Sequence, residues 1–173
     1  MKKFLLLIVL TVSLSLSAFS QKYGYIDSEY ILSNIPEYKE AQKELDRMAA
    51  NWQKDIEKRF ASIDSMYKKY QVEAITLPEN LKQKREDDII KAEQDAKELQ
   101  RKRFGKDGDL FKKREELVKP IQDRVFNAIE AIAKEKGYAF VFDAAGSMTI
   151  VYADPKFDIN DLVMQRLGIV VKN

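Results

Sequence analysis

Apolar residues recur every three or four positions through a long, charge-rich stretch between residues 37 and 136. This spacing predicts long helices that each carry one apolar stripe. The stretch contains glycine only at Gly105 and Gly108, and proline only at Pro78 and Pro120. Pro78 lies in a short turn-like sequence, so we expect the stretch to fold there into two antiparallel helices.

Two matched helical arms are predicted, covering residues 37–119 with their tip near residues 76–80. The first arm spans about 60 Å at about 1.5 Å per residue. A single stripe on so long a helix has to meet another helix to be buried. The predicted seam of the first arm contains Tyr38, Ala41, Leu45, Met48, Trp52, Ile56, Phe60, Ile63, Tyr67 and Tyr70, and that of the second contains Leu81, Ile89, Ala92, Ala96, Leu99, Phe104, Leu110 and Leu117.

The remaining segments, residues 21–36 and 120–173, predict a small β-rich body from which the arms project. Strand-like sequences occupy residues 23–27, 138–142 and 148–153. Because proline disfavours a helix interior, we expect Pro120 to separate the second arm from a body helix at 121–136. A further short helix is predicted between residues 158 and 168. The predicted fold class is therefore α+β.

Three strands per chain leave open sheet edges and too little core, so the sequence predicts oligomerisation through the body. Edge pairing between copies would close a barrel. The strand side chains are expected in the body core or at a subunit interface, with no decision between these two places. They are Tyr25, Ile26, Phe140, Phe142, Ile150 and Tyr152.

The first twenty residues predict a secretory signal peptide. Lys2 and Lys3 precede an apolar run, and Ala18 and Ser20 supply small residues before a cleavage point. The alternative is an uncleaved anchor, but the run is shorter than the roughly 20 residues that a membrane span needs. We therefore expect residues 1–20 to be removed, and an exported mature chain without stable membrane insertion.

The amino-acid composition excludes several kinds of functional site. The chain has no histidine and no cysteine, which excludes imidazole bases, thiol nucleophiles and disulfides. Its formal charge of +2 falls to zero once Lys2 and Lys3 are removed with the signal. A neutral chain lacks the basic excess that nucleic-acid binding requires. We expect no enzyme, no cofactor and no metal site.

Gly105 and Gly108 lie three residues apart within the predicted second arm. Each glycine costs about 1 kcal/mol relative to alanine inside a helix. One interpretation is a hinge that lets the outer part of the arm swing. The other is that an exposed helix face simply tolerates them.

Several segments resemble the Skp/OmpH family. The most specific are residues 113–122, with the sequence KREELVKPIQ, and residues 131–143, with the sequence AIAKEKGYAFVFD. The segment YIDSEYIL at residues 25–32, followed by Pro36 and Glu37, is similar to the first strand of the family and the start of its long helix. The resemblance covers the whole chain after the predicted signal.

This resemblance implies an ATP-independent periplasmic holdase. Members of the family are trimers in which a barrel-like body carries three helical tentacles around a cavity. The implied partners are unfolded outer-membrane proteins on their way to the assembly machinery. The alternative function, from another class, is a structural coiled-coil spacer or adaptor of the cell envelope.

Local basic clusters and seam aromatics are the candidate client-binding residues. The basic candidates are Lys68, Lys69, Lys82, Lys84, Arg85, Arg101, Lys102 and Arg103, and the aromatic candidates are Tyr67 and Tyr70. The alternative for the charges is an ordinary solvated helix face. The alternative for the aromatics is packing between the two arms.

Overall fold

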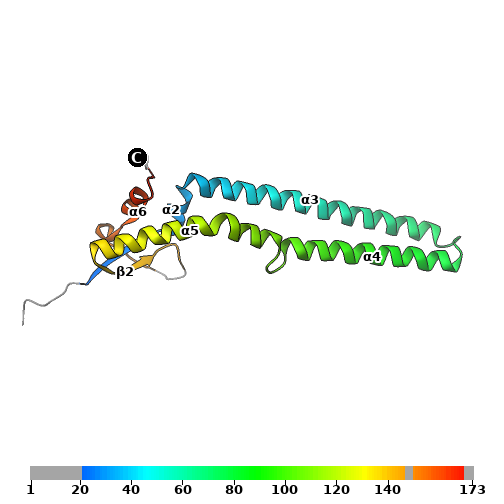
Figure 1. Ribbon diagram of the computed structural model, residues 1–173. Helices are drawn as coiled ribbons and strands as arrows, with labels where there is room; N and C mark the ends of the chain where they lie inside the picture. The colour runs from blue at the N-terminus through cyan, green and yellow to red at the C-terminus, as the bar shows by residue number, and fades with distance from the viewer. Residues whose placement is uncertain (1–20, 147–149, 170–173) are drawn as a thin grey trace, which may run out of the picture. The chain divides into compact units, whose positions relative to one another are not determined.

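The computed structural model describes residues 21–146 and 150–169. The chain divides into two compact units, one formed by residues 32–124 and the other by the segments on either side. Figure 1 labels the α-helices of both units and strand β2. Each unit is described by itself.

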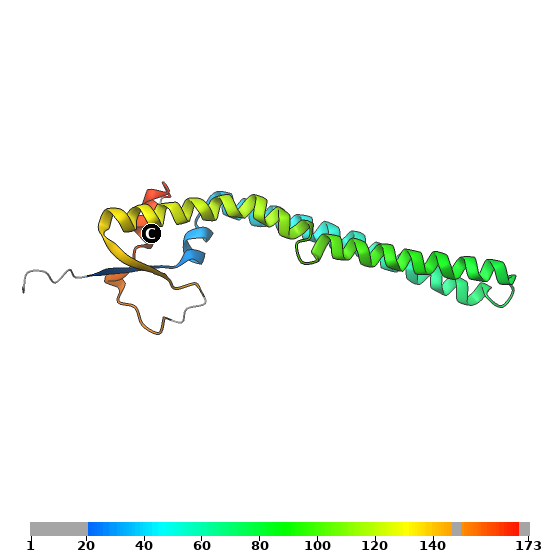
Figure 2. The ribbon, with the colours of Figure 1, turned by 60° about the horizontal axis from the view of Figure 1, so that its bottom comes forward.

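The first unit is a helical hairpin. Helix α3 (Pro36–Glu73) and helix α4 (Glu79–Phe104) run antiparallel and lie side by side (Figures 1 and 2). Pro36 occupies the first turn of α3, where its missing N–H group has no helical partner to lose. Pro78 directly precedes α4, which confirms the predicted turn.

Few side chains form the hairpin's core. In α3 the buried residues are Ala41, Leu45, Ile56 and Ile63. Ile63 packs with Ile89 and Ala96 of α4, which carries only these two buried residues. An antiparallel pair with so thin a seam keeps most of its surface in water, as the dense charges of the sequence predict.

Helix α5 (Asp109–Lys136) corrects the prediction at Pro120. It continues through Pro120, so a separate helix beginning at residue 121 is wrong. Pro120 is exposed, and so is Glu116, whose carbonyl loses its helical hydrogen bond. Water can satisfy that carbonyl, so the helix does not end there. The actual interruption lies between α4 and α5, at residues 105–108.

The second unit contains a two-stranded parallel sheet. Strand β1 (Lys22–Ile26) pairs with strand β2 (Tyr138–Asp143), and helix α2 (Ser28–Ser33) follows β1. Gly137, at φ 72°, ends α5 in the left-handed conformation that favours glycine. A 3-10 turn η2 (Pro155–Phe157) and helix α6 (Asn160–Arg166) complete the unit.

The third strand predicted at 148–153 is not formed by residues 150–153, and residues 148 and 149 lie outside the described part. Val151 is 94% exposed and Tyr152 is 82% exposed. A strand exists only where another strand accepts its backbone hydrogen bonds, and the described chain offers this segment none. The prediction of three strands per chain is therefore wrong for the described residues.

The buried side chains of the second unit come from β1, α2 and α5 and from α6 with the residue before it. These fully or nearly buried side chains are Ile26, Ile31, Val125, Ala128, Ile132, Ile159, Val163 and Met164. Polar contacts reinforce this core: the Asp27 N–H donates to Asn160 Oδ1 at 2.8 Å, and the Ser28 N–H donates to Asp143 Oδ1 at 3.0 Å. Within the described residues, no helix has both the length and the apolar character required to cross a bilayer.

Candidate functional site

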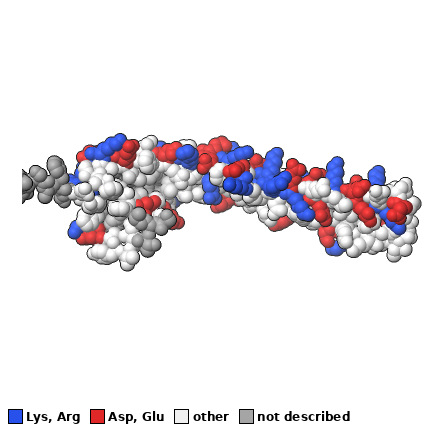
Figure 3. Space-filling view, turned by 90° about the horizontal axis from the view of Figure 1, so that it is seen from below, with Lys and Arg blue, Asp and Glu red and all other residues white. Residues whose placement is uncertain are grey.

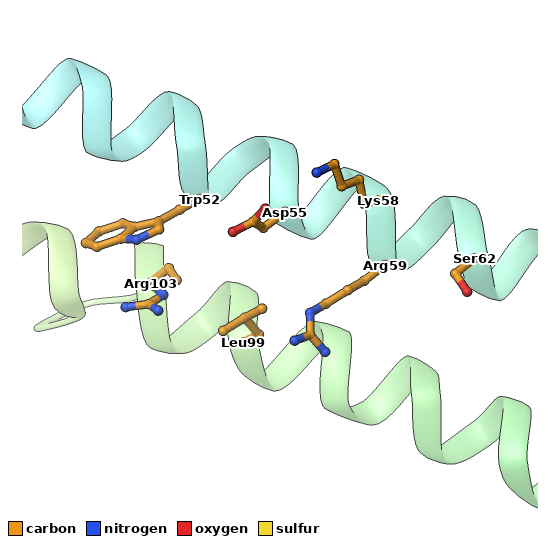
Figure 4. A pocket seen from close by; sticks show the side chains of 7 residues that line it. All are labelled: Trp52, Asp55, Lys58, Arg59, Ser62, Leu99 and Arg103. Atoms are coloured by element: carbon orange, nitrogen blue, oxygen red, sulfur yellow. The ribbon is translucent and has the colours of Figure 1, made fainter.

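A shallow groove of about 410 Å³ lies along the hairpin between α3 and α4. Figure 4 shows its lining side chains, which are Trp52, Asp55, Lys58, Arg59 and Ser62 from α3, and Leu99 and Arg103 from α4. The α3 residues recur three or four positions apart, which places most of them on one strip beside the buried seam. The groove therefore combines cationic and apolar walls.

Arg103 is held in place at one end of the groove. Its guanidinium lies 4.5 Å from the centre of the Trp52 ring and 2.6 Å from a carboxylate oxygen of Asp109. Trp52 also packs edge-on against Phe104, with ring centres 6.3 Å apart. These contacts connect α3, the end of α4 and the start of α5, so they fix the groove's wall at the helix interruption.

Arg59 and Lys58 carry charges that no ion pair neutralises within the part of the chain that the structure describes. The Arg59 side chain reaches toward α4 across the groove (Figure 4). Eight other cations of the hairpin form an ion pair with a carboxylate three or four residues away on the same helix, as Lys43 and Lys97 do. The groove therefore has a local positive excess on an otherwise balanced surface.

Near the tip, Tyr70 ties the two helices together. Its hydroxyl donates to the Glu86 carboxylate, and Arg85 lies 3.9 Å from Glu73 across the same gap. The hydrogen bond to Glu86 is the main cause of a raised pKa of Tyr70, with burial adding to it. Tyr70 is half-buried against the Ile63–Ile89–Ala96 cluster, which supports packing between the arms for this residue.

This contact predicts an alkaline sensitivity of the hairpin. Because the folded pKa of Tyr70 is raised, its hydrogen bond stabilises the fold fully below the ordinary tyrosine pKa of about 10. That contribution is lost as the pH rises through the folded pKa. We expect the stability difference between wild type and Tyr70→Phe to shrink between about pH 9 and pH 12, measured by urea unfolding. A difference that stays constant over this range would contradict the assignment.

The predicted basic residues do not gather in one patch. Lys68 pairs with Asp64 at 2.6 Å, Lys69 with Glu73 at 3.7 Å and Lys82 with Glu79 at 3.6 Å. Among the described residues, Lys84, Arg101 and Lys102 have no ion pair. Figure 3 shows Lys and Arg side chains interspersed with Asp and Glu along the hairpin. Of the predicted set, only Arg103 lines the groove.

Several large apolar side chains lie exposed on the hairpin. Phe60 and Tyr67, seven residues apart and so on one side of α3, are 37% and 51% exposed. The prediction that both belong to the buried seam is wrong. Ile90 is 53% exposed on α4, and Val72 and Ile75 are 78% and 89% exposed near the tip. Sequence reasoning assigned no role to these last three, nor to Arg59.

The residues predicted for the body have different environments. Ile26 is buried at 4% exposure and Tyr25 is half-buried, whereas Phe140 is 56% exposed. Phe140 stacks between Tyr23 and Phe142, at ring-centre distances of 6.0 and 6.2 Å. Ile150 and Tyr152 belong to no strand. A role in subunit contacts stays a prediction for all six residues.

The glycine pair lies in the interruption between α4 and α5. Gly105 N–H donates to the Arg101 carbonyl at 2.8 Å, and Gly108 N–H to the Gly105 carbonyl at 2.9 Å. A Cβ at Gly105 would lie 2.3 Å from the Arg101 carbonyl oxygen. Asp107, at φ 59°, has the left-handed conformation. The segment is thus a tight turn, and its use as a hinge stays a prediction.

One family model matches most of the chain. The family model described as outer membrane protein (OmpH-like) matches residues 22–167. An uncharacterized protein from Aquifex aeolicus (strain VF5) is 29% identical over 167 residues, which is 96% of each chain. A crystal structure from Caulobacter crescentus CB15, described as a candidate outer membrane chaperone (OmpH-like), superposes with a TM-score of 0.67 at 11% identity. That superposition covers 85% of this chain and 83% of the other, and shows a shared fold.

Proposed function

The chain belongs to the OmpH-like family of outer membrane proteins, and on this premise we propose that it is an ATP-independent chaperone of the periplasm. Its clients are unfolded outer-membrane proteins, which it keeps from aggregating during transit. The holding surface is provided by the helical hairpins of several copies. No catalytic step is involved, and release follows client folding or transfer to another protein.

The observation that carries this proposal is the exposure of large apolar side chains on a hairpin whose remaining surface is charged. Phe60, Tyr67 and Ile90 are each at least one-third exposed. Each offers an apolar contact to a non-native chain, and the charges around them prevent a continuous adhesive surface. Such contacts are individually weak, so a client stays soluble and can still be released.

Charge is a smaller part of this holding surface. Most of the hairpin's ion pairs join residues three or four apart on one helix and are largely exposed. Exposed pairs of this kind contribute little energy, and salt screens them over about 10 Å. We therefore expect client binding to depend only modestly on salt.

We propose assembly into a trimer, and the second unit supports this. β1 and β2 form only a two-stranded sheet, and Phe140 and Tyr152 expose aromatic surface that another copy can cover. Pairing of strand edges between three copies would close a barrel. In the mature chain the signal peptide, residues 1–20, is removed after export.

The turn at residues 105–108 supplies the hinge of the proposal. It interrupts the hydrogen-bonding of two long helices between Phe104 and Asp109. The arm beyond this point can change its direction by small backbone adjustments in the turn. Clients of different size would then be accommodated without rebuilding the seam between α3 and α4.

The test is suppression of aggregation by the purified chain of residues 21–173. An unfolded outer-membrane β-barrel protein is diluted from urea, and light scattering is followed with and without the chain and ATP. We expect suppression at about one trimer per client, with no effect of ATP. A variant with Phe60→Gln, Tyr67→Gln and Ile90→Gln should suppress aggregation several-fold less, because each change removes exposed apolar area from the holding surface.

Two results would contradict the proposal. The first is unchanged scattering with wild-type chain in several-fold excess. The second is a monomeric mass in solution, measured by light scattering coupled to size-exclusion chromatography.

The alternative spacer or adaptor function draws support from Val72 and Ile75, which are exposed at the tip. It predicts a stable complex formed through the tip and no suppression of aggregation.

A further inference from the structure

We propose that the groove between α3 and α4 is a discrete docking site for peptide segments in which a carboxylate side chain lies next to a bulky apolar one. This inference rests on the proposed function, since the segments belong to its unfolded clients. It goes further because it gives the hairpin a preference for sequence. Dispersed apolar contacts alone would supply none.

The cationic side of the groove fits a carboxylate. Arg59 reaches across the gap toward α4 and has no ion pair among the described residues. A guanidinium binds a carboxylate through two parallel hydrogen bonds, which a lysine ammonium does not reproduce. Ser62, one turn further along α3, adds a hydroxyl donor beside the same space. Lys58 contributes positive potential from the rim.

Arg103 has a different part in the groove. Asp109 neutralises its charge at 2.6 Å, and its guanidinium lies against the Trp52 ring. Arg103 therefore forms a fixed part of the groove's wall. Among the described residues, the unpaired positive charge of the groove comes from Arg59 and Lys58. The groove therefore has an apolar end at Trp52 and a positively charged end at Arg59 and Lys58.

The apolar side of the groove fits a neighbouring large side chain. Trp52 and Leu99 are each half-buried, so each still presents apolar surface to the groove. In an extended peptide, adjacent side chains point to opposite sides of the backbone. Because the groove is open, a bent peptide can also bind, and its carboxylate and its apolar side chain can then both point into the groove. Burial of one such side chain contributes more than an exposed ion pair does.

Asp55 distinguishes a peptide from a phosphate-bearing ligand. Its carboxylate lies among the cationic residues and has no ion pair within the described chain. It would repel a phosphate dianion more strongly than a singly charged carboxylate, and it can accept a hydrogen bond from a peptide N–H. The combination of donors, one acceptor and an apolar wall therefore matches a peptide with one negative charge.

The experiment measures binding of a short labelled peptide to the complete chain of residues 21–173. The probe is fluorescein-Gly-Ser-Phe-Asp-Leu-Ser-Gly with an amidated end, so that the aspartate supplies the only carboxylate of the peptide part. Fluorescence anisotropy gives the dissociation constant. We expect Arg59→Gln to weaken binding about tenfold, and the Asn-for-Asp peptide to bind wild type about tenfold more weakly, because each removes a charge-assisted hydrogen bond.

Lys54→Gln is the matched control, because Lys54 lies five residues before Arg59, is exposed and lines no part of the groove. Its peptide affinity should stay within twofold of wild type. Ser62→Asp, which adds a negative charge inside the groove, should abolish measurable binding. Equal weakening by Arg59→Gln and Lys54→Gln would show attraction by bulk charge and overturn the proposal.

Two further results would also overturn it. Inorganic phosphate, or vesicles of phosphatidylglycerol, could displace the peptide from wild type at equal concentration, which would make the groove a general anion site. Wild type could also fail to bind the peptide while it still suppresses client aggregation. That last result would remove the groove site and leave the proposed holding function intact, whereas failure to suppress aggregation removes the function itself.

Discussion

Replacing Ile56 with alanine should lower the free energy of unfolding of the hairpin by about 2–5 kcal/mol. Ile56 is 2% exposed, and the nearest other buried side chains of α3 are Leu45 and Ile63. Its loss leaves a long section of the seam with no buried side chain larger than a methyl group.

Urea unfolding followed by circular dichroism measures this change, and hydrogen exchange shows where the hairpin opens. The matched control is Phe60→Ala, four residues further along the same helix. Phe60 is larger than Ile56 but 37% exposed, and its removal should change stability by about 0.5 kcal/mol or less. Equal destabilisation by both changes would show that burial does not determine the hairpin's stability.

Replacing Gly105 with alanine should cost about 1–3 kcal/mol, because an added methyl group meets backbone. Its Cβ would lie 2.3 Å from the Arg101 carbonyl oxygen, and that oxygen already accepts the Gly105 N–H. The turn must therefore open or the end of α4 must unwind. Gly146→Ala is the control, since its Cβ would lie 3.4 Å from the nearest atom, an ordinary contact.

The same pair of variants bears on the hinge. If the turn stays tight in every conformation of the hairpin, position 105 requires glycine. Gly105→Ala then lowers the free energy of unfolding by the amount given above. If both alanine variants unfold at the same urea concentration as wild type, the turn is loose, and the close approach at Gly105 is not maintained in solution. Thermal unfolding with the same variants provides a second measurement.

The helices were largely predictable because their signals are local. Pro36 marks the start of α3, Pro78 directly precedes α4, and the spacing of apolar residues identifies both as helices. Burial along the seam was less predictable. Phe60 and Tyr67 fit the apolar stripe of α3, yet they are 37% and 51% exposed.

Features that depend on distant contacts were missed. Residues 150–153 have the composition of a strand, but no second strand within the described chain pairs with them. The groove requires Arg59 to lie opposite Leu99, which depends on how α4 is aligned along α3. The turn at residues 74–78 and the contact of Trp52 with Phe104 accompany that alignment, and neither is encoded in the local pattern.

The parallel pairing of β1 and β2 determines how this chain can fold. About 110 residues separate Ile26 from Tyr138, so the sheet has a very high contact order and is entropically slow to form from an open chain. The hairpin shortens that search, because its closure brings Glu37 within 3.2 Å of Arg124. Nucleation near Pro78 and zipping along the seam would thus precede strand pairing. If copies assemble through the second unit, as proposed, the rate at which they become competent to assemble would follow the stability of the hairpin.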